Sequence, residues 1–478
     1  NDTLAMDKFN MGCRFESYLI HTLQGNTEAA AAAKAEMKAL MRGAVHSYLE
    51  YAIDYASAGM YEEATQLLSF VTEENEATYP MVYYALGYFA SKMGKKDEAL
   101  NLYKKAETMC PDYCFPNKLE EVLMLNDAMS LNPEGAKAPY YLGNFHYAAR
   151  IYDEAIACWE KSASIDDTYP TVLRNLSLAY YNKQHNPQKA LATLEKAYNL
   201  DTTDARILME LDQLYKKLRY PHRQRLDFLE AHADVVEQRD DLCIERITLY
   251  NQLGEYQKAY DLINSRKFHP WEGGEGKVTS QYLLCRVELA KIAIREGRFA
   301  DAVRLLKETE KYPDNLGEGK LSMAEENDIH YWMGCAYEGL GEEALAKEYF
   351  TKATKGSAEP AIAFFYNDQQ PDKIFYQGLA WRKLGEEDKA RSRFNRLIKH
   401  GEKHLFDKVK IDYFAVSLPD LLIWDDDLNV RNQIHCNLVM GMGYLGLGDK
   451  EQARKFLSEV ARLDINHQAG KQLLEMCG

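Results

Sequence analysis

The sequence predicts an all-α protein, a right-handed superhelical solenoid built from antiparallel helix pairs. Three observations predict this fold: small residues recur at spacings of 34 or 35 in several places, an alanine follows most of them at a fixed distance, and a glycine often lies between the two. Periods of 20 to 50 residues are typical of repeat architectures, in which each unit stacks on its neighbours. We therefore expect a single array of about ten repeats over residues 1–478.

One position on the first helix of each repeat serves as a phase marker. The markers are Ala52, Gly87, Gly143, Ser177, Asp212, Ile247, Ala290, Gly334, Gly378 and Gly441. Nine of the ten repeats have an alanine on the second helix, twelve residues after the marker or, at Ala190, thirteen residues after it. The exception is the repeat marked by Asp212, which has Gln224 at this position. A turn glycine lies seven residues after the marker at Gly59, Gly94, Gly254, Gly297, Gly341, Gly385 and Gly448.

The segment 80–111 shows the pattern most clearly, with Gly87 on the first helix, Gly94 at the turn, Ala99 on the second helix and Pro111 at the end. It resembles the tetratricopeptide repeat, a 34-residue helix pair with small residues at these positions. The small residues let the two helix backbones approach each other, so a bulky residue at Ala99 would overpack the contact.

Irregular spacings indicate three insertions, near 112–135, 268–278 and 402–430. The first has a helical apolar pattern and fits a half-repeat, the second is too rich in glycine for a regular helix, and the third is apolar enough to pack onto the array. Residues 27–42 are expected to open the array. Residues 466–478 are expected to form a C-terminal capping helix.

Composition excludes several classes of partner. A formal net charge of −15 disfavours nucleic acid and anionic membranes, and no apolar stretch is long enough to insert into a membrane. Nine scattered cysteines indicate buried free thiols, and we expect the protein to be cytoplasmic. The chain begins with Asn1 and has no signal pattern, so we expect the native N-terminus to be missing.

Several longer strings resemble a bacterial family: FHPWEGGEG at 268–276, YYLGN at 140–144, RNLSLAYYN at 174–182, ELDQLY at 210–215 and IDYFAVSLPDLLIWDDDL at 411–428. In that family a tetratricopeptide array follows an N-terminal β-rich domain of unknown function that looks like carbohydrate-active sandwich domains. The resemblance implies that the natural protein is longer. It implies no known activity and no catalytic residue.

Polar residues at two marker-related positions indicate a binding face on the first helices. Asn144 and Asn175 match the asparagines that, in peptide-clamping tetratricopeptide domains, hydrogen-bond the backbone of a bound peptide. The basic part of that clamp does not match, because Tyr140 and Glu210 stand where cations are needed and only Arg206 fits. Ordinary groove lining is the alternative. The candidate binding residues are Tyr140, Asn144, Arg174, Asn175, Tyr181 and Arg206.

Trp271 in the glycine-rich insertion is a further candidate. As an exposed ring beside the amides of Gly273, Gly274 and Gly276 it would offer a ledge for a sugar or an anion; the alternative is a buried plug with turn-forming glycines. A phosphate-binding loop is excluded, because Trp271 stands where the first glycine of that motif is required.

The sequence contains no recognisable catalytic or metal-binding pattern. His400 and His404 are four residues apart without a third ligand, and Cys110 and Cys114 lack a second pair at zinc spacing. The acidic run 425–427 fits a helix N-terminus. We expect no enzyme activity, no metal and no cofactor.

The sequence thus favours an interaction scaffold whose concave groove binds a peptide, a partner protein or the chain's own N-terminal domain. The alternative is an accessory module of a carbohydrate-active protein, which would contribute Trp271 to a sugar-binding site on the missing β-domain.

Overall fold

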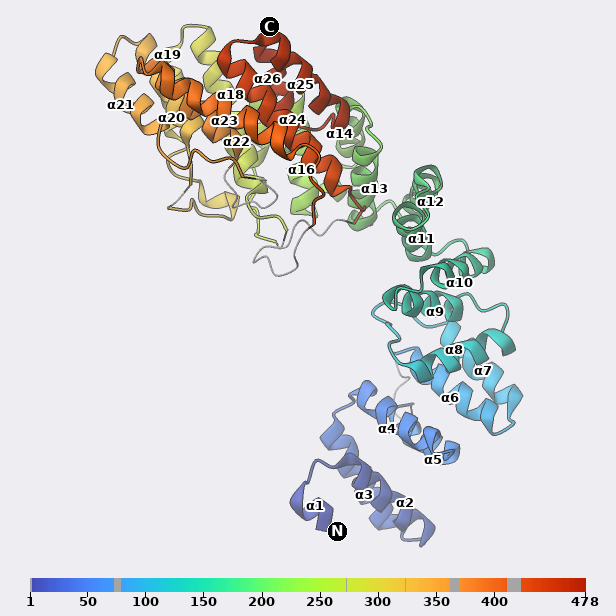
Figure 1. Ribbon diagram of the computed structural model, residues 1–478. Coiled ribbons are helices and arrows are strands. Elements are labelled where there is room, and N and C mark those ends of the chain that lie inside the picture. The colour runs from blue at the N-terminus through green and yellow to red at the C-terminus, as the bar shows by residue number, and fades with distance from the viewer. Residues whose placement is uncertain (1, 73–78, 272, 323, 362–369, 411–422) are drawn as a thin grey trace. The chain divides into compact units, whose positions relative to one another are not determined.

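The computed structural model describes residues 2–72, 79–271, 273–322, 324–361, 370–410 and 423–478, and these residues form helices and connecting loops with no strand among them (Figure 1). The predicted all-α array of antiparallel helix pairs is confirmed. The chain divides into two compact units, Asn1–Asp201 and Thr202–Gly478, called here the N-terminal and C-terminal units.

Among the described residues, the N-terminal unit contains five helix pairs and two additional helices. Its helices are α1 (Asp2–Met6), α2 (Met11–Leu23), α3 (Thr27–Met41), α4 (Val45–Ser57), α5 (Tyr61–Thr72), α6 (Met81–Lys92), α7 (Lys96–Glu107), α8 (Leu119–Leu131), α9 (Lys137–Ala148), α10 (Tyr152–Ile165), α11 (Pro170–Asn182) and α12 (Pro187–Leu200). The pair α2–α3 precedes the first predicted repeat, and α8 is the helix within the first insertion. Residues 27–42 therefore do not open the array; their helix is the second member of a pair.

Among the described residues, the C-terminal unit contains six helix pairs, the short helix α15, a 3-10 helix and a final single helix. Its helices are α13 (Ala205–Lys217), α14 (His222–Ala231), α15 (Ala233–Val236), α16 (Asp240–Gln252), α17 (Tyr256–Asn264), α18 (Lys277–Arg295), α19 (Phe299–Lys307), the 3-10 helix η1 (Asp314–Leu316), α20 (Asn327–Gly339), α21 (Glu343–Ala353), α22 (Pro371–Lys383), α23 (Glu387–His404), α24 (Leu428–Leu447), α25 (Lys450–Leu463) and α26 (Gln468–Met476).

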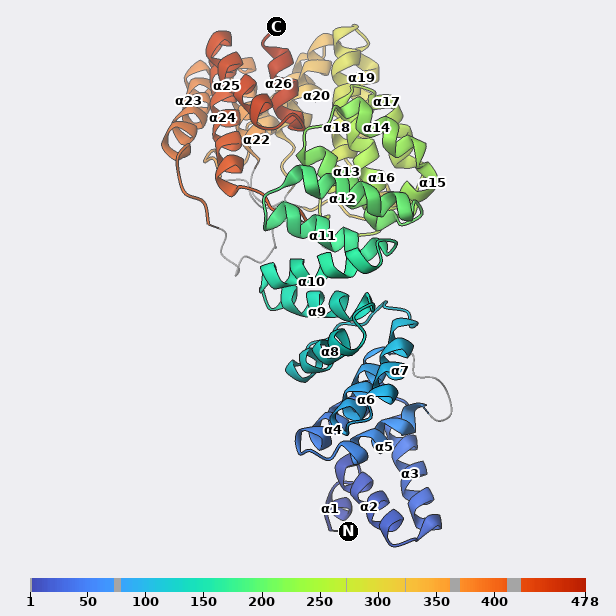
Figure 2. The same ribbon diagram turned by 90° about the vertical axis from the view of Figure 1, so that its right-hand side faces the viewer.

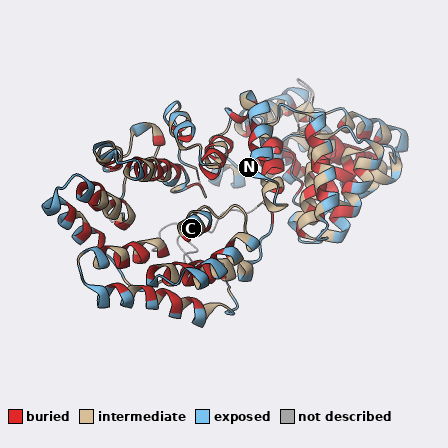
Figure 3. Cartoon of the chain, turned by 90° about the horizontal axis from the view of Figure 1, so that it is seen from above, coloured by how far each residue is buried: buried red, intermediate tan, exposed pale blue. Residues whose placement is uncertain are grey.

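Each marker glycine makes room for a large side chain sixteen residues later on the second helix of its pair. A Cβ atom on Gly87 would lie 2.4 Å from the ring of Tyr103, and one on Gly143 would lie 2.4 Å from the indole of Trp159. Gly334, Gly378 and Gly441 make the same contact with Phe350, Phe394 and Leu457. Figure 3 accordingly shows buried residues on the sides of the helices that face neighbouring helices. A small-to-large contact therefore holds together the pairs that carry a marker glycine.

The turn inside each pair requires a left-handed backbone. All seven turn glycines have φ between 74° and 85°. Where a pair lacks the glycine, another residue takes the same conformation: Arg150 at φ 63°, Arg219 at φ 64° and His185 at φ 51°. These three turns are strained, because side chains other than glycine disfavour positive φ.

Extra loop residues explain the longer spacing of repeats in the C-terminal unit. The loops after α17 and α19 pack on each other, since the Phe268 amide donates to the Asn315 carbonyl at 2.7 Å. The Asn315 side chain donates to the carbonyls of Ile263 and Arg266, each at 2.9 Å. Hydrogen bonds therefore join the loop after α17 to the loop after α19.

All nine cysteines are free thiols, and five of them are buried. Burial raises the pKa of Cys114, Cys243, Cys285 and Cys436 to about 12, so these thiols remain protonated at neutral pH. Within the described ranges, no helix has the length and apolarity needed to cross a membrane.

Candidate functional site

The two asparagines selected from the sequence contact each other in the N-terminal unit. Asn144 lies on α9 and Asn175 on α11, the first helices of neighbouring pairs, and the Asn175 amide donates to Asn144 Oδ1 at 3.2 Å. Both side chains are half-buried. This arrangement places two amide groups side by side on the face formed by first helices.

Groups that can only donate fix the orientation of both amides. Trp159 Nε1 donates to Asn144 at 3.1 Å, so the atom it contacts must be the oxygen. Arg174 Nη1 donates to Asn175 at 3.1 Å, which assigns the oxygen of that side chain in the same way. The chain Trp159–Asn144–Asn175–Arg174 therefore has one consistent set of hydrogen bonds.

This orientation leaves a donor and an acceptor available beside each other. Among the described residues, the Nδ2 group of Asn144 has no hydrogen-bond partner, and Asn175 Oδ1 accepts only from Arg174. A peptide group offers the complementary pair, a carbonyl oxygen and an N–H. Arg174, Leu178 and Tyr181 are half-buried at helical spacing on α11 and extend this surface along one side of the helix.

Tyr140 has a different position from the other candidates. It is 5% exposed, and its ring packs against Tyr169 at 5.2 Å and Tyr141 at 5.3 Å. Its carbonyl accepts a second, longer hydrogen bond from Trp159 Nε1 at 3.3 Å. Tyr140 therefore supports the asparagine pair from within the core, while Tyr181 lies nearer the surface.

Two candidates belong to the C-terminal unit. Arg206 lies on α13, where its Nε donates to the buried carboxylate of Glu210 at 3.1 Å. Trp271 is half-buried, and its indole covers Gly274, where an added Cβ would lie 2.0 Å from the ring. The turn glycines Gly273 and Gly276 both have positive φ. Arg206 and Trp271 therefore belong to a different unit from the asparagine pair.

The sequence interpretation missed Trp159, which orients the pair. Its spacing of sixteen residues after Gly143 was the available signal, since the same spacing recurs in four other pairs. Gly143 lets the indole reach α9, and the indole then holds Asn144. The packing rule of the repeat thus positions the candidate site.

A second polar centre lies at the start of the C-terminal unit. Arg225 on α14 donates to both oxygens of Asp212 on α13, at 3.0 and 2.6 Å, and to Glu245 on α16 at 2.7 Å. Lys216 donates to both oxygens of Glu245 at 2.9 and 3.1 Å. Burial alone would raise the pKa of Glu245, but Lys216 and Arg225 outweigh it and lower this pKa to about 2.

The C-terminal end of the chain docks beside this centre. Asn466 Oδ1 accepts from Arg225 Nη1 at 3.4 Å, and its carbonyl accepts from Gln252 Nε2 at 2.5 Å. Gln468 and Gln281 exchange two amide hydrogen bonds at 2.9 and 3.0 Å. Helix α26 lies beside α18 in two perpendicular views (Figures 1 and 2). The predicted closing helix thus contacts helices near the beginning of its own unit.

The described part of the third insertion also docks on α13. Trp424 is 1% exposed, and its Nε1 donates to the Glu210 carbonyl at 3.1 Å. Lys217 pairs with Asp426 at 3.1 Å, and Asp427 caps α24 by accepting from two backbone amides. Residues 411–422 of this insertion lie outside the described residues.

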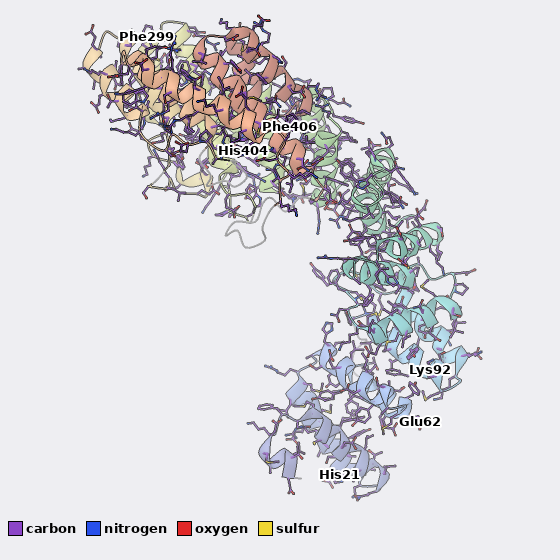
Figure 4. All side chains as sticks on the ribbon, in the orientation of Figure 1. His21, Glu62, Lys92, Phe299, His404 and Phe406 are labelled. Atoms are coloured by element: carbon purple, nitrogen blue, oxygen red, sulfur yellow. The ribbon has the colours of Figure 1, made fainter. Side chains whose placement is uncertain are left out.

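Histidines gather at the end of α23 but do not form a metal centre. The rings of His400 and His404 lie 4.7 Å apart, and His404 Nδ1 contacts Asp407 at 2.6 Å. Figure 4 labels His404 and the exposed Phe406 just beyond this helix. Burial and the neighbouring His404, His435 and Lys403 lower the pKa of His400 to about 4. No three histidine, cysteine or carboxylate side chains in the described chain are placed to hold a metal ion.

Comparison with known proteins identifies the repeat. One family model described as tetratricopeptide repeat matches residues 82–113 and 328–355, and a second with the same description matches residues 374–400. These segments coincide with the pairs α6–α7, α20–α21 and α22–α23.

Solved structures of similar proteins share low identity with this chain. YrrB, described as a TPR protein with an unusual peptide-binding site, is 18% identical, with coverage of 43% of this chain and 94% of its own and a TM-score of 0.20. The pilF protein of Pseudomonas aeruginosa is 19% identical, with 46% and 90% coverage and a TM-score of 0.27. The P58(IPK) TPR domain is 14% identical, with 91% and 97% coverage and a TM-score of 0.23. These values carry no information about a ligand. The family-model matches and the helix pairs that they cover show that the chain contains tetratricopeptide repeats.

Proposed function

We propose that this protein is a non-catalytic interaction scaffold whose N-terminal unit binds an extended peptide segment of a partner protein. The observation that supports this function is the oriented pair Asn144–Asn175, which offers one donor and one acceptor side by side. An extended peptide presents its carbonyl and N–H groups at the edge of the chain. It can therefore hydrogen-bond the Asn144 donor and the Asn175 acceptor at once.

The surroundings of the pair support the same ligand. Arg174 and Tyr181 lie half-buried on the same helix as Asn175, and such residues contribute contact area at protein interfaces. Because the ligand's backbone is recognised by the amides, its side chains would be selected by Arg174, Leu178 and Tyr181. The basic clamp for a terminal carboxylate is incomplete, so we assign the ligand as an internal peptide segment.

The carbohydrate-binding alternative stays a prediction. It depends on the exposure of Trp271, whose indole is half-buried over Gly274. The resemblance to a bacterial family with a β-rich N-terminal domain stays a prediction, and so does binding to that domain. The predicted cytoplasmic location is supported by nine free thiols, which suit a reducing compartment.

Selection from a displayed library of random twelve-residue peptides tests the proposal. The full chain is expected to enrich a sequence family that Asn144→Ala/Asn175→Ala does not enrich. A control variant, Asn101→Ala, changes an exposed asparagine on α7 and is expected to enrich the same family. Equal enrichment by the double variant, or no enrichment by the wild-type chain, would contradict the proposal.

A further inference from the structure

The C-terminal segment, residues 462–472, occupies a polar surface at the start of its own unit. We define this docking face by Lys216, His222, Arg225, Gln252 and Gln281, which contact the segment. The contacting residues are separated by 187 to 250 positions in the chain. The C-terminus consequently lies inside the arc of helices of the C-terminal unit (Figure 3).

The segment binds the docking face through side-chain and backbone hydrogen bonds rather than through a large apolar core. Asn466 alone accepts from Arg225 and Gln252 and donates to the Lys216 carbonyl at 3.4 Å. Lys471 donates to the carbonyl of Gln252. The buried Leu473, just after the segment, belongs to the core cluster of α22 to α25. The contacts of Asn466 and Lys471 with the docking face are therefore polar.

The docking face is not fully satisfied by its resident segment. Asn251 and Gln252 are each 4% exposed, and Asn251 Oδ1 and Gln252 Oε1 have no hydrogen-bond partner among the described residues. A buried acceptor without a donor costs about 1–3 kcal/mol. Of these two residues, Gln252 also contacts Asn466 and Lys471, so the resident segment leaves the buried Gln252 Oε1 without a donor.

We propose that the docking face is a second peptide-binding surface, which residues 462–472 occupy in the structure and to which a partner segment with the same polar pattern binds when that segment is displaced. The required pattern is Asn466, Gln468 and Lys471, which is Asn-x-Gln-x-x-Lys, with further donors for Asn251 and Gln252. This surface is independent of the asparagine pair in the N-terminal unit, so the two proposals succeed or fail separately.

Tethering explains why the surface is closed in the free chain. A segment on the same chain competes at an effective concentration of the order of millimolar, so a free peptide at micromolar concentration cannot displace it. Removing the two amide side chains of the segment should release it and expose the docking face. The free peptide would then bind without competition.

Fluorescence anisotropy with a labelled peptide of residues 462–478 tests this proposal, with C477S in the peptide to prevent oxidation. The full chain carrying Asn466→Ala/Gln468→Ala is expected to bind the peptide at least tenfold more tightly than the wild-type chain. A control peptide with the same two substitutions is expected not to bind. Equal affinity of the wild-type and variant chains, or no binding to a folded variant, would overturn the proposal.

Hydrogen exchange of the wild-type chain provides a measurement that does not depend on folding of the variant. About 1 mM of the unlabelled peptide should accelerate exchange of the amides in α26, because the peptide displaces the resident segment. Unchanged exchange in α26 at that concentration would also overturn the proposal. The control peptide should leave the exchange rates unaltered.

Discussion

Arg225 and Asp212 form a buried ion pair in which the guanidinium donates from Nε and Nη2 to the two carboxylate oxygens, at 3.0 and 2.6 Å. Asp212 stands at the marker position, where other repeats carry small or apolar residues, and Arg225 lies thirteen residues later. The least regular repeat in the sequence is therefore held by charge instead of by close packing. Its Arg225 also reaches Asn466 at the C-terminal end.

Removing one member of this pair should destabilise the C-terminal unit strongly. Arg225→Met leaves Asp212 buried without its partner, and we expect a loss of about 3–5 kcal/mol in the free energy of unfolding. Asp212→Ala/Arg225→Leu removes both charges and should lose less, because it imitates the apolar contact of the other repeats. Urea denaturation of the variants compares these values. A double variant less stable than Arg225→Met would contradict this explanation.

Acid should weaken the same centre through Glu245. Its pKa is lowered to about 2 in the folded chain, so its contribution to stability is present above the unfolded pKa of about 4.5. That contribution is lost as the pH falls from about 4.5 toward 2. Between pH 7 and pH 3, the free energy of unfolding should fall less for Glu245→Gln than for the wild-type chain. An equal fall in both chains would show that another group dominates the loss of stability in acid.

The contact between Gly143 and Trp159 should tolerate no added methyl group. Gly143→Ala places a Cβ 2.4 Å from the indole, and the overpacking should cost about 1–3 kcal/mol. Gly319→Ala is the matched control, because nothing lies within 4 Å of its added Cβ and its φ is not positive. In thermal denaturation, Gly143→Ala should have a lower melting temperature than Gly319→Ala. Similar melting temperatures for the two variants would refute the packing rule.

The strained turn at Arg150 offers a stabilising substitution. Arg150 has φ 63° where most pairs carry glycine, so Arg150→Gly should relieve part of the roughly 1–2 kcal/mol cost of the left-handed conformation. The gain is reduced by the greater freedom of glycine in the unfolded chain. We expect a net increase of about 0.5 kcal/mol in unfolding free energy. A decrease would indicate that the Arg150 side chain makes an essential contact.

The buried Trp424 anchors the end of the third insertion. Trp424→Ala should cost about 3–5 kcal/mol, since it removes a fully buried aromatic ring, whereas Trp424→Phe should cost less because it mainly loses the bond to Glu210. The free energy of unfolding in urea measures both. An unfolding free energy unchanged by the alanine variant would show that the insertion is not coupled to the helices.

The sequence predicted the helix pairs because their determinants are local. The turn glycines and the second-helix alanines lie within about twelve residues of their markers. A single steric requirement explains each type of residue: positive φ for the glycines and close approach of two helices for the alanines. The pair α2–α3 was missed because the alanine run 29–33 offers a small residue at every position and so hides the phase.

The contacts that close the C-terminal unit had no local signal. Asn466 contacts residues more than 200 positions away, and an asparagine in a loop is equally suited to many other places. The asparagine pair was predictable because its positions are set by the repeat. Its orientation was not, since that depends on Trp159 and Arg174 together.

The central claim is tested most directly by the affinity of Asn144→Asp for a peptide selected by the wild-type chain. This isosteric change replaces the available donor with an acceptor, so we predict at least tenfold weaker binding in fluorescence anisotropy, equivalent to about 1.4 kcal/mol. Asn101→Asp adds the same charge on α7 and should leave the affinity within twofold. Equal affinities of the Asn144→Asp and wild-type chains would contradict recognition of a peptide backbone by this pair.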